Sequence, residues 1–176
     1  MMRSEATAKP AAPDGPPTEA TDAVAETGHS QWLLCRAGEH LCAIPIEHVI
    51  ETMRLLPIEA VSGAPPYVRG LTIIRGAPVT VIDTGLLVGE RATRSTRLVT
   101  VRTGRRTIAL TAEAVMGVST MAPDKLSQFP PLLRACASEA IEAIGMLDAE
   151  LLFFLRAARI APEDLLDRLE FQGALS

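Results

Sequence analysis

Histidine and cysteine are the side chains that most often bind metals or act as nucleophiles, and this 176-residue sequence has three of each. Their positions match no paired zinc-ligand spacing, so we expect no metal site. Cys42 and His48 could in principle form a nucleophilic pair. However, Cys42 lies in an apolar stretch, where a cysteine is usually a small buried hydrophobe. The six residues are His29, His40, His48, Cys35, Cys42 and Cys136.

The sequence motifs of common catalytic sites are also missing. No G-x-S-x-G nucleophile motif is present. The glycines are dispersed and form neither a dinucleotide fingerprint nor a phosphate-binding loop. No segment combines a nucleophile, a base and a residue that orients them. We therefore predict no catalytic residues, no metal and no cofactor, and expect a binding module rather than an enzyme.

Arginine supplies 15 of the 17 basic residues, and it is concentrated in one segment. Between Arg91 and Arg106 there are six arginines and no acid. This pattern is typical of a solvated hairpin, and the alternatives are a docking surface for an acidic partner or for nucleic acid. Nucleic acid is disfavoured because the chain is poor in aromatic side chains that could stack on bases: it has only one Trp, one Tyr and four Phe. The six are Arg91, Arg94, Arg97, Arg102, Arg105 and Arg106.

Charge and hydrophobicity divide the chain near residue 31. Residues 1–31 hold two basic and five acidic residues, four prolines and almost no large hydrophobic side chains, so we predict a disordered tail there. Residues 32–176 then carry 15 basic and 16 acidic residues, a net charge of −1, and form the predicted folded domain. The sequence has no signal peptide, no membrane span and no disulfide framework, so we expect a cytoplasmic protein without membrane insertion.

Short strand-like segments separated by turns make up most of the predicted domain. The turns are expected at 38–39, 76–78 and 103–104. Apolar spacing predicts one or two helical turns over 46–53, a helix over 132–143 and a final helix over 162–170. This order of elements favours two small β-barrels that share a core. Strands are predicted over 32–36, 41–44, 67–74, 79–82, 98–101, 107–112, 115–118 and 151–155.

The stretch PPYVRGLTIIRGAPVTVID, from Pro65 to Asp83, resembles the central signature of CheW-like domains, the coupling proteins of bacterial chemotaxis. Three further segments are similar to the family's first helical connection, a later strand and the closing strand. They are CAIPIEHVIE (42–51), IALTAEAVMGV (108–118) and ELLFFLRAARI (150–160). The resemblance implies a mainly β fold of two five-stranded, SH3-like barrels with short helices and a C-terminal helix, over residues 32–176.

The resemblance also implies which residues contact partners. Ile46, Val49, Glu51, Arg69 and Arg75 are the candidate partner-binding residues. For Arg75 the alternative is an intramolecular ion pair with Glu51, because its planar fork suits a carboxylate, and Val49 could equally belong to the core. Three other residues have structural roles at turns: Gly70, Gly76 and Asp83. Glycine frees the backbone at tight bends, and Asp83 is expected to cap a turn.

The function implied by the resemblance is that of a non-enzymatic adaptor. Its partners would be the regulatory domain of a CheA-type histidine kinase and the cytoplasmic hairpin tip of a chemoreceptor, at receptor clusters on the inner face of the membrane. The alternative hypothesis is a small-barrel nucleic-acid-binding protein that uses the Arg91–Arg106 segment. The chain departs from the family pattern at four positions: Ile73, Gly85, Glu113 and Arg156.

Overall fold

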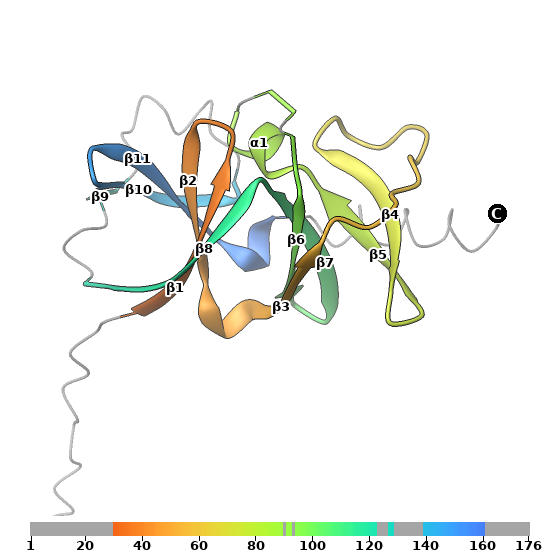
Figure 1. Ribbon diagram of the computed structural model, residues 1–176, viewed down its shortest axis with the longest axis horizontal. Coiled ribbons are helices and arrows are strands. Elements are labelled where there is room, and N and C mark those ends of the chain that lie inside the picture. Colours follow the sequence, from red (N-terminus) through yellow and green to blue (C-terminus); the bar gives the residue numbers. More distant parts are fainter. Residues whose placement is uncertain (1–29, 90, 93, 123–126, 129–138, 161–176) are drawn as a thin grey trace, which may run out of the picture.

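The computed structural model describes residues 30–89, 91–92, 94–122, 127–128 and 139–160. This part of the chain is mainly β, as predicted, with only short helices (Figure 1). The helices are η1 (Ile46–His48), α1 (Thr84–Leu87) and η3 (Ala157–Arg159). The strands are β1 (Ser30–Ala37), β2 (His40–Pro45), β3 (Val49–Arg54), β4 (Val68–Ile74), β5 (Ala77–Ile82), β6 (Arg97–Thr103), β7 (Arg106–Ala112), β8 (Ala114–Met121), β9 (Ser127–Gln128), β10 (Ile141–Leu147) and β11 (Glu150–Leu155).

The first sheet has the strand order β8-β1-β2-β11-β10-β9. Two of its neighbouring pairs, β1–β2 and β10–β11, are antiparallel hairpins, whereas β2 and β11 pair in parallel. The parallel pair brings the N-terminal and C-terminal parts of the described chain together. The two-residue strand β9 adds a sixth strand to the five that were expected.

The second sheet comes from the middle of the chain and has the order β3-β6-β7-β5-β4. It contains the hairpins β4–β5 and β6–β7, and β5 pairs with β7 in parallel. Strands β3 and β4 therefore form its two edges. In Figure 1 the two sheets form two adjoining barrel-like halves, with β6 and β7 close to the first half.

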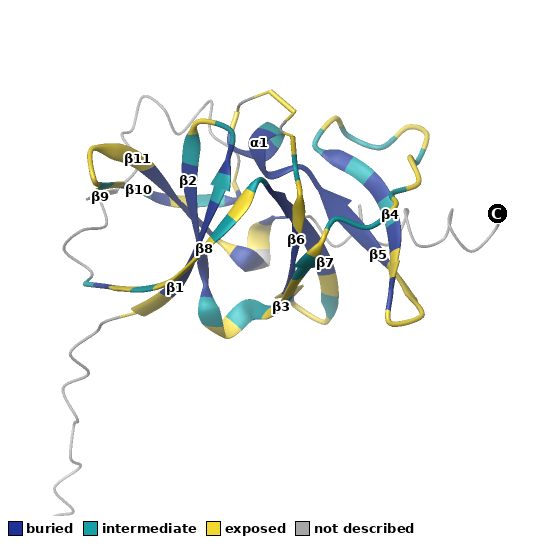
Figure 2. Cartoon of the chain, in the orientation of Figure 1, coloured by how far each residue is buried: buried dark blue, intermediate teal, exposed yellow. Residues whose placement is uncertain are grey.

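A continuous apolar core joins the two halves. Its buried side chains come from both sheets, including Leu33 and Ile44 of the first and Val99 and Ile108 of the second. A smaller cluster around Trp32 fills the first half, and another around Val81 fills the second. Figure 2 shows the buried positions along the strands at the junction of the two halves. The prediction of two small barrels that share a core is confirmed.

Four strands contain a β-bulge, in which two residues of the bulged strand lie opposite one residue of its neighbour. The pairing registers identify the extra residues as Ile50 in β3, Arg69 in β4, Met116 in β8 and Glu142 in β10. None of these four side chains is buried. The bulges in β3 and β8 place large apolar side chains on edge strands, with Ile50 46% and Met116 54% exposed.

Most strands predicted from the sequence are present, but the helix predicted over 46–53 is wrong beyond its first turn. Residues 46–48 form η1, and β3 begins at Val49 and pairs with β6. Along β3, half-buried and exposed side chains alternate, and apolar residues occur on both faces. Their spacing therefore imitates a helical pattern. The turn predicted at 76–78 begins earlier, at Arg75 and Gly76.

Two other helix predictions have different outcomes. The helix over 132–143 is wrong at its end, because residues 141–143 belong to β10, and residues 132–138 lie outside the described part. The C-terminal helix over 162–170 and residues 1–29 of the tail also lie outside it. Serine 30 and Gln31, predicted to belong to the tail, begin β1 instead.

Candidate functional site

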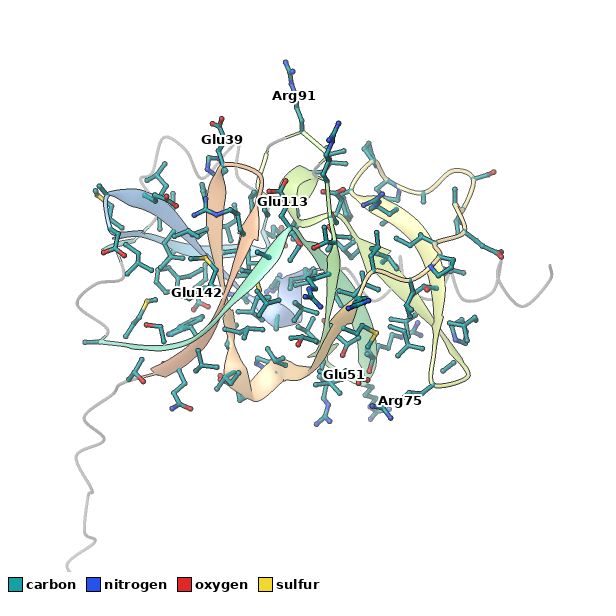
Figure 3. The ribbon with its side chains drawn as sticks, in the orientation of Figure 1. Glu39, Glu51, Arg75, Arg91, Glu113 and Glu142 are labelled. Atoms are coloured by element: carbon teal, nitrogen blue, oxygen red, sulfur yellow. The ribbon has the colours of Figure 1, made fainter. Side chains whose placement is uncertain are left out.

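Arg75 and Glu51 form a two-point ion pair at the surface of the second half. Arg75 Nε donates to Glu51 Oε1 at 2.9 Å, and Nη2 donates to Oε2 at 2.7 Å. The Arg75 side chain is 78% exposed and that of Glu51 is 26% exposed. In Figure 3 the two side chains point toward each other at the lower edge of the molecule. This intramolecular pair is the alternative considered for Arg75 from the sequence.

The backbone of Glu51 is held by a neighbouring strand. Its N–H donates to Thr100 Oγ1 at 3.2 Å, and the Thr100 hydroxyl donates back to the Glu51 carbonyl at 3.2 Å. These bonds lie beside the bulge at Ile50, where the regular pairing of β3 with β6 is interrupted. Thr100 itself is buried, so the carboxylate extends from a fixed backbone position.

The position of Arg75 is set by the turn between β4 and β5. Arg75 has φ 52° and Gly76 has φ 82°. Positive φ at both central residues is the pattern of the type I′ hairpin turn, whose twist matches that of the flanking strands. Glycine adopts this conformation freely, whereas it costs an arginine about 1–2 kcal/mol. The turn therefore holds the arginine outside the barrel and beside Glu51.

The ion pair favours the charged forms of both Glu51 and Arg75. Hydrogen bonds from Arg75 are the main cause that lowers the pKa of Glu51, and the positive charge of Arg75 adds to this effect. The same hydrogen bonds and charge raise the pKa of Arg75 above its ordinary value. Both side chains are thus charged at neutral pH.

Exposed apolar side chains adjoin the ion pair. Ile50 precedes Glu51, and Ile73, which is 63% exposed, lies two residues before Arg75 on β4. In contrast, the predicted partner-binding residues Ile46 and Val49 are half-buried and pack against the shared core. Sequence reasoning missed Ile50 because a helix was expected there; the apolar residues Val49, Ile50 and Met53 do not alternate along the sequence, and the strand becomes evident only from its pairing with β6.

Arg69, the fifth predicted partner-binding residue, lies away from this corner. It is near the start of β4, about 20 Å along the strand from Arg75. Its Nη1 is 3.9 Å from Asp83 Oδ2 and 3.5 Å from Ser95 Oγ. The structure therefore brings Glu51 and Arg75 together, with Ile50 in place of Val49 on the surface, and leaves Arg69 in a separate cluster.

The residues assigned to turns have defined local roles. The fully buried Asp83 is the N-cap of α1, and its Oδ1 accepts a hydrogen bond from the Leu86 N–H at 3.2 Å. Gly70 has φ +140°, and a Cβ at this position would lie 1.9 Å from the Glu59 carbonyl oxygen. Glu59 and Leu71 exchange two backbone hydrogen bonds at this point, so the absence of a side chain allows the two segments to meet.

The arginines of the Arg91–Arg106 segment do not form one surface. Strand β6 runs between Arg97 and Arg102, which separates them by about 16 Å. Arg91 extends outward at the upper edge of Figure 3, opposite Arg75. Arg97 and Arg102 are also an odd number of residues apart in β6 and therefore lie on opposite faces of the strand, so the described residues do not place these arginines on one face, as a basic track for nucleic acid would need.

The two described cysteines, Cys35 and Cys42, are both buried thiols. No group of three or more His, Cys, Asp or Glu residues in the described part could hold a metal ion. Burial raises the pKa of the Cys35 thiol to about 12, so the thiol stays protonated at neutral pH. Its cross-strand partner Cys42 is also buried. No helix in the described ranges is long and apolar enough to cross a membrane.

Comparison with protein-family models matches the CheW-like domain over residues 31–164. The chain belongs to the CheW-like domain family. Its fold is similar to the crystal structure of the scaffolding protein TtCheW from Thermoanaerobacter tengcongensis, with a TM-score of 0.63 and 19% identity, covering 73% of this chain and 89% of that chain. Comparison with curated proteins finds no match. CheW-like membership makes the chain a non-enzymatic scaffold or adaptor of chemotaxis signal transduction.

The four departures from the family pattern lie in different environments. Ile73 is exposed on the edge strand β4, while Gly85 is buried inside α1. Glu113 is half-buried between β7 and β8, and Arg156 Nη2 lies 3.8 Å from Glu142 Oε1. Of the four, Ile73 is the one that adjoins the Glu51–Arg75 pair.

Proposed function

We propose that this protein is an adaptor that couples chemoreceptors to a CheA-type histidine kinase, and that it works at receptor clusters on the inner face of the membrane. The kinase regulatory domain and the cytoplasmic hairpin tip of the receptor are its partners. Membership of the CheW-like family supports this function.

The exposed Glu51–Arg75 pair is the observation that supports a partner contact at this corner. An arginine has five N–H donors. Two of them are used by Glu51, which leaves three for a carboxylate or backbone carbonyl of another protein. Because Glu51 fixes the guanidinium in one orientation, little further side-chain entropy is lost when a partner binds.

Apolar contacts would complete the interface. Ile50 and Ile73 are large, exposed and adjacent in sequence or along the strand to the two charged residues. Interfaces typically combine such an apolar contact with arginine at well-packed positions. We assign the kinase regulatory domain to this corner, because the pair offers both a directional polar contact and two apolar anchors.

Binding of the kinase regulatory domain, together with receptor-coupled kinase activity, tests this function. Arg75→Glu and Ile50→Asp are expected to weaken binding at least about tenfold, which corresponds to about 1.4 kcal/mol. Val49→Asp is a poorer test, because Val49 packs against the core and its loss would affect folding. Glu39→Arg, which reverses an exposed charge at the edge of the molecule opposite Glu51 and Arg75 in Figure 3, serves as the control. Unchanged binding and coupling in both Arg75→Glu and Ile50→Asp would refute the proposed site.

A further inference from the structure

We propose that four exposed arginines beside the start of β6 form a docking surface for an acidic segment of a partner protein. We refer to these residues together as the Arg54–Arg97 surface. They come from the end of β3, the connection before β6 and the first residue of β6. The four are Arg54, Arg91, Arg94 and Arg97.

Arg54 and Arg97 are direct cross-strand partners in the β3–β6 pairing. Residues directly opposite each other in an antiparallel pair share one face of the sheet, and two like charges at such positions repel each other. Both arginines are exposed. A carboxylate placed between the two guanidinium groups would turn this repulsion into attraction, and each group could donate two parallel hydrogen bonds to it.

The other two arginines are carried by a connection that is anchored next to this pair. The Leu55 N–H donates to the Thr96 carbonyl at 2.9 Å, which ties the residue after Arg54 to the residue before Arg97. The Thr96 hydroxyl also donates to the Glu113 carbonyl at 2.6 Å. Arg94 lies three residues from Arg97, so it remains near the pair, and Arg91 extends away from the body in Figure 3.

These four arginines are unpaired within the described part of the chain. Their side chains form no ion pair or hydrogen bond there, even though Glu113 follows the residue that pairs with Arg97. Five other arginines do have carboxylate partners: Arg36, Arg69, Arg75, Arg156 and Arg159. The Arg54–Arg97 surface therefore offers several guanidinium groups whose hydrogen-bonding capacity is unused.

The composition of this surface favours an acidic protein over nucleic acid. Proteins bind nucleic acid through the summed charge of many phosphate contacts, and the four arginines here are separated from Arg102 and Arg105 by the length of β6. Proteins that bind single-stranded nucleic acid also typically present exposed aromatic side chains on which the bases stack. Of the described aromatic residues, Trp32, Phe153 and Phe154 are buried and Tyr67 is half-buried.

The inference does not depend on the proposed kinase contact. Glu51 and Arg75 lie at the lower edge of Figure 3 and Arg91 at the upper edge. Arg54 follows Glu51 by three residues on β3, about 10 Å along the strand, so the two assignments are separated by their variants, Arg54→Gln/Arg97→Gln for this surface and Arg75→Glu for the corner. The acidic-segment assignment can therefore fail while the kinase contact at the Glu51–Arg75 corner holds, and the reverse.

The experiment measures binding of a labelled oligoglutamate peptide to the full chain by fluorescence anisotropy. Arg54→Gln/Arg97→Gln is compared with Arg102→Gln/Arg105→Gln, which removes the same charge from the other end of the β6–β7 hairpin. The first variant is expected to bind the peptide at least about tenfold more weakly than the unmodified chain, because two charge-assisted contacts are lost. The second is expected to lose less than about twofold. Affinity of the unmodified chain should fall between about 50 mM and 200 mM salt.

Several outcomes would overturn the proposal. One is an equal loss of affinity in both double variants, which would indicate a net-charge effect, and another is no measurable peptide binding. Tighter binding to a DNA duplex or to phosphatidylglycerol vesicles than to the peptide would assign the surface to a different class of partner. Tighter peptide binding after neutralising Glu5, Asp14, Glu19, Asp22 and Glu26 would mean that the chain's own N-terminal segment occupies the surface.

Discussion

Arg75 holds Glu51 through two hydrogen bonds of 2.9 and 2.7 Å and thereby joins the two edges of the five-stranded sheet. Glu51 lies on β3 at one edge, and Arg75 follows β4 at the other. Strands β3 and β4 are the outermost strands of this sheet, so the ion pair spans the seam of the barrel-like half. A contact at the seam can serve two purposes, to close the barrel and to present a fixed guanidinium to a partner.

The pH dependence of this pair follows from the lowered pKa of Glu51. Because the pKa is lower in the folded state than in the unfolded state, the pair stabilises the fold above the unfolded pKa. That contribution is lost as pH falls through the folded pKa. An NMR titration of the Glu51 carboxyl carbon is expected to give a midpoint below that of an ordinary glutamate. Arg75→Gln should move the midpoint upward; an identical midpoint in this variant would show that Arg75 does not perturb Glu51.

Gly70 is expected to tolerate no side chain. In Gly70→Ala the new Cβ would overlap the Glu59 carbonyl and the residue would keep a strained positive φ, so we expect a loss of about 2–5 kcal/mol in the free energy of unfolding. Gly63→Ala is the control, because Gly63 also has positive φ but nothing lies within 4 Å of its Cβ position. It should lose about 1–2 kcal/mol. Equal losses by urea denaturation would contradict the role of the close approach.

Asp83 caps the start of α1 and also forms an ion pair with Arg69. Asp83→Ala removes the acceptor for the Leu86 N–H and is expected to lower the free energy of unfolding by about 1–2 kcal/mol. Asp83→Asn keeps a side-chain oxygen at the cap but removes the charge near Arg69, which is 3.9 Å away. The midpoint temperature of thermal unfolding should therefore be higher for Asp83→Asn than for Asp83→Ala. If Asn were as destabilising as Ala, the charge rather than the cap would be the main contribution.

The repulsion between Arg54 and Arg97 predicts a substitution that increases stability. Arg54→Glu places opposite charges at directly paired positions, and should raise the free energy of unfolding by about 0.2–1 kcal/mol. Arg54→Gln removes the repulsion without adding attraction and should fall between Arg54→Glu and the unmodified chain. The differences should shrink at high salt. A stability order that places the unmodified chain first would show that the two arginines do not repel each other.

The strands were predictable where turn residues and apolar runs coincide. Gly38, with φ 64°, separates β1 from β2, and Gly104, with φ 59°, separates β6 from β7. Both hairpins were expected because glycine supplies the positive φ that such turns require. Their pairing into two different sheets was suggested by the family resemblance and depends on contacts between distant segments, such as the parallel pairing of β2 with β11.

The segment 46–53 shows why part of the site was missed. Its apolar residues fit a helical period, but strand pairing with β6 overrides that local preference. The bulge at Ile50 is determined by the register against Val101 and Thr100, which the sequence of β3 does not contain. In contrast, the ion pair of Arg75 with Glu51 was one of two alternatives considered from the sequence, because the planar guanidinium suits a carboxylate.

Exchange of the two charges tests the adaptor account most directly. In Glu51→Arg/Arg75→Glu the internal ion pair can form again with reversed polarity, so the stability lost in Arg75→Glu should be at least partly recovered. The outward charge remains reversed. The decisive measurement is the affinity of this double variant for the CheA-type kinase regulatory domain. The account predicts that binding stays at least about tenfold weaker than that of the unmodified protein. Recovery of affinity together with stability would contradict it, because the pair would then serve only to hold the barrel closed.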